Sequence, residues 1–318
     1  MTPYDRAVRS TSRTLRLTLL LALLLALELG ACIRRVEVPP SLHDAASCPT
    51  FASPEASGTS TDRRLNELSG VVLSRRQPGV LWVHNDSGEG PTLYALSSAG
   101  DLLAEVELSG AEAVDWEDIA LGPGPTEGVD YLYVGDIGDN RRRRSSVTIY
   151  RLAEPDVRGG SGTLTLTHRA DPLVLHYDKR PANAEALLVD PKDGAIYVIT
   201  KDAGAAALYA EEDGVLRYVQ PVDAGEEALV TAADISADGQ MIALRTYNRG
   251  YLWRRNPEET LASALARPPC PIDVAEEPQG EAIAFDPAAP RLITLSESRE
   301  HGGGGVPIHS LPFVSPGR

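Results

Sequence analysis

The sequence predicts an all-β protein built as a β-propeller, on the evidence of a repeat and of short strand-like runs. From about residue 65 the apolar runs are four to seven residues long and end at Gly, Pro, Asn or Asp, a pattern typical of strands and turns. Five similar blocks begin at residues 67, 117, 185, 231 and 281, so that successive starts lie 50, 68, 46 and 50 residues apart. Repeats of this length are typical of propellers.

The blocks share one internal order of residue types. In four of them a Glu opens a first apolar run, and an acid follows a second apolar run 16 to 19 residues downstream. The remaining block begins at Thr231 without a Glu, and its second run ends in Arg245. The repeat therefore places acidic side chains, as well as strands, at equivalent positions.

The first repeat contains four strand-like runs, at 68–73, 80–84, 92–96 and 102–108. Four strands form one propeller blade, and stacked blades bury their faces only when each has neighbours. We therefore expect five four-stranded blades over residues 65–318, with six left open. The last repeat has three clear runs, so part of residues 40–64 is expected to add a closing strand. A pair of β-sandwiches, the alternative, would not explain the repeat.

Residues 1–31 are expected to be a lipoprotein signal peptide. Four Arg precede an apolar stretch, residues 17–29, which is too short to span a bilayer. Leu29-Gly30-Ala31-Cys32 resembles the lipobox of bacterial lipoproteins, which implies that Cys32 carries the lipid. The alternative is an ordinary signal peptide with a free Cys32. Lipidation would hold the protein in the bacterial cell envelope, facing the periplasm or the cell exterior, with the membrane contacted through the anchor alone.

Residues 32–64 are rich in Pro, Ser, Ala and Thr, and we interpret them as the lipidated tether. If Cys32 is lipidated, Cys48 and Cys270 remain, and an oxidising compartment allows them one intramolecular disulfide. Two free thiols are the alternative, because the sequence does not show the geometry that a disulfide requires. Such a bridge would tie the tether to the fourth repeat.

The net charge disfavours nucleic acid as a partner. The whole chain of 318 residues carries −15, and removal of residues 1–31, whose net charge is +2, leaves −17. A protein of this charge repels phosphate backbones. The sequence also contains no P-loop, no H-E-x-x-H motif and no cysteine spacing typical of zinc sites.

The repeated acids are expected to meet at one mouth of the central channel. The second strand of a blade runs antiparallel to the first, so the start of the first and the end of the second lie on the same face. Crowded carboxylates raise one another's pKa unless a cation neutralises them, and Ca²⁺ prefers oxygen ligands. The second block is the densest in acids, and it predicts a calcium site at Glu117, Asp118, Asp136 and Asp139. The alternative is that strand-start carboxylates bind backbone N–H groups and lock neighbouring blades together.

Other residues at strand ends predict a ligand site in the same mouth. Lys201 and Arg245 follow second strands, and an Arg can hold a carboxylate or phosphate with two hydrogen bonds. A salt bridge to a channel acid is the alternative for Arg245, and a hydrogen-bonded turn residue is the alternative for His84. The predicted ligand-binding residues are His84, Asp86, Glu185, Lys201, Arg245 and Glu281.

Several phrases, among them Val114-Asp-Trp-Glu-Asp-Ile-Ala120 and Tyr133-Val-Gly-Asp-Ile-Gly-Asp-Asn140, resemble those of secreted bacterial propeller lipoproteins of uncharacterised function. The resemblance spans residues 65–300, and that group is loosely similar to phytase-like and TolB-like propellers. It implies a calcium site on Glu117, Asp136 and Asp139. It does not imply phytate hydrolysis, because that activity needs a cleft rich in Lys and Arg, and this chain has three Lys.

Three functions follow from these observations. The first is a lipid-anchored propeller that binds a small-molecule or protein partner, with Ca²⁺ at its acidic mouth. The second is a metal-dependent phosphoesterase in which Arg245 or Lys201 clamps the phosphoryl oxygens. The third is a glycoside hydrolase that uses two carboxylates across the channel. Whether the protein is an enzyme stays open at this point, because fold alone does not choose among them.

Overall fold

The computed structural model describes residues 48–86, 90–158, 162–225, 229–297 and 305–314, and within them it confirms the all-β propeller. The predicted signal peptide, the predicted lipidation site Cys32 and most of the predicted tether lie outside the described residues. The described strands form five blades of at least four strands each.

The blades follow one another along the chain. Blade 1 contains β3 (Leu68–Leu73), β4 (Val80–Asn85), β5 (Thr92–Ser97) and β6 (Leu102–Ser109); blade 2 contains β7 (Trp116–Pro123), β8 (Asp130–Asp136), β9 (Val147–Ala153) and β11 (Asp171–Tyr177). Blade 3 contains β12 (Ala184–Val189), β13 (Ile196–Thr200), β14 (Ala207–Glu212) and β15 (Val215–Pro221); blade 4 contains β16 (Val230–Ile235), β17 (Met241–Thr246), β18 (Gly250–Arg254) and β19 (Cys270–Ile272). Blade 5 contains β20 (Gly280–Phe285), β21 (Arg291–Ser296) and β22 (Val306–Val314), completed by β1 (Thr50–Phe51) and β2 (Glu55–Ser60).

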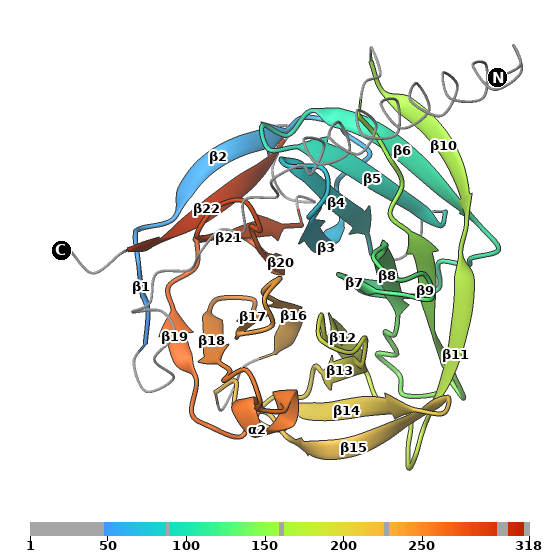
Figure 1. Cartoon of the computed structure of the whole chain (residues 1–318), viewed down its shortest axis with the longest axis vertical. Helices are drawn as coiled ribbons and strands as arrows, with labels where there is room; N and C mark the ends of the chain where they lie inside the picture. The colour runs from blue at the N-terminus through green and yellow to red at the C-terminus, as the bar shows by residue number, and fades with distance from the viewer. Residues whose placement is uncertain (1–47, 87–89, 159–161, 226–228, 298–304, 315–318) are drawn as a thin grey trace, which may run out of the picture. The chain divides into compact units, whose positions relative to one another are not determined.

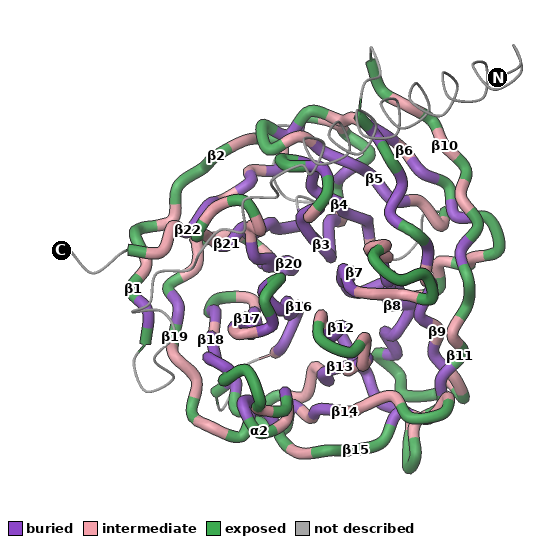
Figure 2. The backbone as a smooth tube through the Cα atoms, in the orientation of Figure 1, coloured by how far each residue is buried: buried purple, intermediate pink, exposed green. Residues whose placement is uncertain are grey.

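The five first strands close a ring around a common axis. Each of β3, β7, β12, β16 and β20 contacts the next, and β20 returns to contact β3 (Figure 1). All five are buried along almost their whole length (Figure 2), because each packs between two neighbouring blades. Closure of the ring therefore buries both faces of every blade, as the repeat predicts.

The N-terminal strands close blade 5. Both β1 and β2 pair antiparallel with β22, with Thr50 opposite Val314 and Ser60 opposite Val306. The expected closing strand from residues 40–64 is thus present. It joins the first described residues to the last blade, so that the ring is fastened by segments from both ends of the chain.

A belt of two consecutive strands runs along the outside of three blades. The strand β10 (Leu164–Arg169) pairs in parallel with β6 of blade 1, and β11 then forms the outer strand of blade 2. The end of β11 pairs in parallel with the start of β15. The belt accounts for the long spacing between the second and third repeats.

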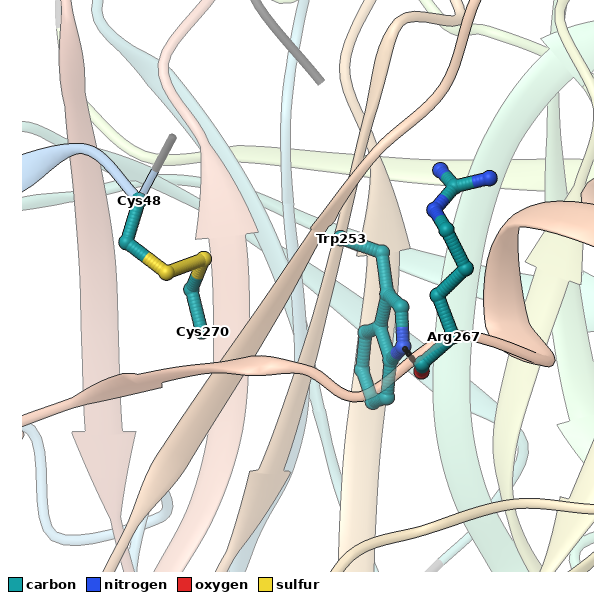
Figure 3. The surroundings of a disulfide bond; sticks show 4 residues. All are labelled: Cys48, Trp253, Arg267 and Cys270. Atoms are coloured by element: carbon teal, nitrogen blue, oxygen red, sulfur yellow. Dashed lines mark hydrogen bonds between the residues drawn. A yellow bond between two sulfur atoms is a disulfide. The ribbon is translucent and has the colours of Figure 1, made fainter. Parts of the chain in front are cut away.

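A disulfide fastens the closing strand to blade 4 (Figure 3). Cys48 and Cys270 are bonded, with their Cα atoms 5.4 Å apart and a sequence separation of 222. On the same blade, the indole N–H of Trp253 donates to the carbonyl of Arg267 at 2.8 Å, which holds the segment that leads into β19. The short helix α2 (Leu261–Leu265) precedes that segment. Among the described residues no helix is long and apolar enough to cross a bilayer.

We expect replacement of both cysteines by Ser to lower the free energy of unfolding. The chain-entropy model gives an upper limit of about 5 kcal/mol for a loop of this length. The measurement is a denaturant melt of Cys48→Ser/Cys270→Ser against the oxidised protein, with the reduced wild type as the matched control. A double variant as stable as the oxidised protein would show that the ring is closed by strand pairing alone.

Candidate functional site

Every first strand carries a β-bulge at the same position, near the end of the ring where the strand begins. The register with the second strand shifts between Leu68 and Gly70 in blade 1, and at the equivalent position in the other four blades. A bulge re-aims the side chain of its extra residue. The five bulged residues, all buried, are Ser69, Glu117, Glu185, Thr231 and Glu281.

We call this end of the ring the acidic mouth, and we define it by Asp86, Asp115, Glu117, Glu185, Lys201, Glu281 and Glu297. Three of its residues are bulged Glu, and the remaining acids follow second strands or precede β7. The Ser and Thr at the other two bulges bind backbone carbonyls of neighbouring blades, Glu117 O at 2.6 Å and Gly280 O at 3.0 Å. The acids therefore share a small space, as the sequence predicts.

Three of these acids form a close cluster. One carboxylate oxygen each from Asp86, Asp115 and Glu117 can be chosen so that all lie within 4.8 Å of one another. In the part of the chain that the structure describes, no Lys or Arg forms an ion pair with any of the three. The Oδ1 atom of Asp86 is buried without a hydrogen-bond partner. The negative charge of the cluster is therefore not neutralised by any ion pair among the described residues.

The pKa values of all three carboxyl groups are raised by burial and by the neighbouring acids. Burial, followed by the charges of Asp115 and other acids, raises the pKa of Asp86 to about 7. Burial and the charge of Glu185 likewise raise the pKa of Asp115 above its usual value. Burial, the charge of Glu185 and a hydrogen bond with Glu185 raise the pKa of Glu117 well above its usual value. Without a cation, the cluster holds protons near neutral pH.

The loop after β8 closes against the cluster at Gly138. A Cβ atom at this position would overlap Oε1 of Glu117 and Oδ2 of Asp115. The backbone N–H of Gly138 also donates to the carbonyl of Asp115 at 3.1 Å. Glycine is therefore required here because the backbone passes close to the two carboxylates.

Lys201 neutralises the other side of the mouth. Its Nζ lies 2.9 Å from Oε2 of Glu185 and 4.8 Å from the centre of the Tyr247 ring. Burial lowers the pKa of Lys201, but the charges of Glu185 and Glu281 outweigh burial, so the net pKa is raised and the ammonium stays charged. Burial raises the pKa of Glu281 to about 8 despite Lys201, and its Oε2 atom has no hydrogen-bond partner.

Asp118 lies deeper and connects three first strands. Its Oδ2 accepts the backbone N–H groups of Leu187 at 2.9 Å and Ala233 at 3.2 Å, and its Oδ1 accepts that of Ile119. Asp234 makes a similar link to Phe285 at 2.8 Å. This arrangement corresponds to the inter-blade lock that the sequence left as the alternative, and it leaves Asp118 apart from the three-carboxylate cluster.

Asp136 and Asp139 hold the loop after β8. Arg144 donates to Oδ1 of Asp136 at 2.7 Å, and the backbone N–H of Arg144 donates to Oδ2 of Asp139 at 2.7 Å. The backbone N–H of Asp115 also donates to Asp136 at 3.1 Å. Of the four predicted metal ligands, the structure therefore places Glu117 in the cluster and gives Asp136 and Asp139 partners of their own.

Arg245 is fully buried and pairs with an acid that the sequence pattern does not single out. Its guanidinium lies 2.5 Å from Oε2 of Glu277, and Glu277 also binds His309 at 2.6 Å and Thr294 at 3.1 Å. Glu277 lies in the segment before β20, outside the repeated runs. Arg245 thus forms the buried salt bridge that was its alternative interpretation, and it does not face the mouth solvent.

His84 is also a core residue. It is 0% exposed, its Nδ1 lies 2.8 Å from the carbonyl of Asn85, and its ring meets Trp116 edge to face at 5.6 Å. Burial lowers its pKa to about 4. A neutral, enclosed imidazole supports the packing of blades 1 and 2, in line with its structural alternative.

A separate cavity of about 400 Å³ lies beside blade 3 and α2. Small apolar residues line most of it, including Ala205, Val222, Ala224 and Leu265. None of the carboxylates of the acidic mouth lines this cavity. Two acids, Asp202 and Asp223, line this cavity, but the close cluster of three carboxylates lies at the mouth.

Comparison with known proteins finds distantly similar solved structures and no matching family. No protein-family model matches the chain, and no curated protein matches it. An aldose sugar dehydrogenase from Streptomyces coelicolor, solved with bound PQQ, is 14% identical with a TM-score of 0.48 over 83% of this chain and 99% of its own. A gluconolactonase from Xanthomonas campestris is 11% identical with a TM-score of 0.47, and the match covers 85% of this chain and 96% of the gluconolactonase. A luciferin-regenerating enzyme is 9% identical with a TM-score of 0.48, and the match covers 84% of this chain and 96% of that enzyme.

We expect the protein in a chelator to lose stability as the pH rises. The folded-state pKa values of Asp86 and Asp234 are about 7 and that of Glu281 is about 8, above the value of about 4 for unfolded carboxyl groups. Their protons stabilise the folded state below pH of about 4, and this stabilisation is lost as the pH rises through 7 to 8. Thermal melts at pH 5.5 and 8 measure the slope, which Glu281→Gln should make shallower. A melting temperature that climbs with pH would contradict this assignment.

Arg245→Met should destabilise the fold without removing any residue of the acidic mouth. Removal of one partner of a buried ion pair costs about 3–5 kcal/mol, because the other charge is left uncompensated. Since Glu277 is the stranded partner, the double variant Arg245→Met/Glu277→Gln should recover part of the loss in a denaturant melt. If the single variant keeps wild-type stability, the salt bridge is not a structural element.

Proposed function

We propose that the protein is a lipid-anchored, extracytoplasmic propeller that binds a ligand or partner at its acidic mouth with the help of one Ca²⁺ ion. The observation that carries the proposal is the cluster of Asp86, Asp115 and Glu117. Its three carboxylates converge without a basic partner, whereas the neighbouring acid Glu185 has Lys201.

The donor set fits calcium. All three groups offer hard oxygen atoms, and two oxygens bound to one Ca²⁺ lie at most about 5 Å apart, which is twice the usual ligand distance. The separation of 4.8 Å or less meets that limit. The unpartnered Oδ1 of Asp86 and the space kept open by Gly138 agree with the same interpretation. Three protein ligands leave coordination positions for water or for a ligand.

The charge of the mouth argues against a phosphorylated ligand. Six carboxylates define the mouth against one Lys, so a single Ca²⁺ leaves it negative when the acids are ionised. Neither of the basic groups expected to clamp a phosphoryl group is free, because Lys201 binds Glu185 and Arg245 binds Glu277. A neutral polyhydroxyl compound or a basic partner fits this mouth better than a phosphoester does.

Glycoside hydrolysis is a second candidate, favoured by one observation. Glu117 and Glu185 face each other closely enough to share a hydrogen bond, and the pKa of Glu117 is raised well above its usual value. Retaining enzymes place their acid and nucleophile carboxyl groups about 5–5.5 Å apart, so a sugar bound between Glu117 and Glu185 would have to separate the two side chains. The test is the release of reducing sugar from a panel of glycans. Release by the wild type that is abolished in Glu117→Gln would show that the protein is a glycoside hydrolase and not only a binding protein.

Calcium should raise the thermal stability of residues 33–318, and Mg²⁺ should raise it less. A ligand that binds only the folded state at 100 times its Kd adds about 2.7 kcal/mol. Asp115→Asn and Glu117→Gln should lose this response because they remove two of the three ligands. Glu112→Gln, a change at an exposed acid close to the cluster in sequence, is the matched control and should keep it. A folded wild type that does not respond to Ca²⁺ would refute the calcium site.

A further inference from the structure

The tether joins the propeller at the end of the ring that lies opposite the acidic mouth. In blade 5, β20 starts at the mouth with Glu281 and runs away from it, and β21 returns. The strand β22 therefore starts at the level of the mouth, at Val306, and ends far from it, at Val314. Because Thr50 pairs with Val314, the described chain begins at the far end.

The disulfide fixes this point of attachment. Cys48 lies two residues before β1 and is bonded to Cys270 on the outer strand of blade 4. Two covalently joined blades therefore hold the end of the tether. The tether cannot peel away along β22 toward the mouth without breaking either the disulfide or the pairing of β1 and β2.

From this geometry we infer that the acidic mouth points away from the membrane that carries the lipid anchor, and that it receives its ligand from the aqueous compartment and not from the lipid surface. This inference rests on the lipid anchor of the proposed function.

Electrostatics favours the same orientation. The acids of the mouth would be repelled by anionic lipid headgroups, whose surface potential attracts basic segments instead. The loops at the far end carry both signs, with exposed Arg76 between β3 and β4 and exposed Lys192 beside Asp193 between β12 and β13.

Two exposed valines allow a matched test of the orientation. Val114 lies beside Asp115 at the mouth and is 53% exposed, and Val314 lies at the far end and is 42% exposed. The full-length protein would be lipidated in cells as Val114→Cys or Val314→Cys, labelled with a fluorescent donor and placed in vesicles of neutral and anionic lipids that contain a headgroup acceptor. Thermal melts of both variants would verify the fold before labelling.

We expect energy transfer to be clearly stronger from position 314 than from position 114. Equal transfer, or stronger transfer from 114, would overturn the orientation. The non-lipidated Cys32→Ser forms should show no transfer at either position. If the forms that keep Cys32 also show no energy transfer at either position while Ca²⁺ still stabilises them, the proposed lipid anchor is wrong and so is the inferred orientation. The proposed calcium site would not be affected by that result.

Discussion

The constraint on which the rest of the structure depends is the closure of five equivalent strand starts around one axis. Each first strand has its bulge at the same position, so a single repeated feature directs five side chains into one mouth. Three of the five are Glu, and like charges at such distances cannot all ionise in a buried site. Ser69 and Thr231 at the other bulges relieve the crowding, because hydroxyl groups can satisfy neighbouring carbonyls without adding charge.

The remaining charge is divided between a fixed cation and an exchangeable one. Lys201 belongs to the chain and stays beside Glu185, where the Tyr247 ring adds a cation–π contact. Glu117 lies on the other side of Glu185 and gathers Asp86 and Asp115 instead of a base. The Lys201–Glu185 pair is thus complete by itself, whereas Glu281 is completed by a proton and the three-carboxylate cluster by protons or by a metal ion. This asymmetry within a repeated fold is the strongest sign of function in the molecule.

The sequence predicted the strands, the closing segment and the acids of the mouth, because strand periodicity and the spacing of the repeat follow directly from the order of residues. It did not separate the roles of the acids. Asp118 and Glu117 are adjacent, yet the bulge sends one to backbone N–H groups and the other to the mouth. Glu277 lies in a segment outside the repeated runs, so only the path of the chain brings it to Arg245. Arg245 ends a second strand, as the pattern indicates, but its side chain turns between blades.

Blade 5 links the anchoring end of the protein to its chemistry. It contributes Glu281 and Glu297 to the mouth, and its outer strands β1 and β2 come from the segment that continues into the tether. Glu281 keeps its place because β20 packs between β16 and β3, and β20 is held in turn by the sheet that β1 and β2 complete. Since the Cys48–Cys270 bond secures these strands to blade 4, a load applied along the tether falls on the two blades together. If the chain is anchored from this end, as proposed above, the mouth can therefore keep the spacing of its carboxylates.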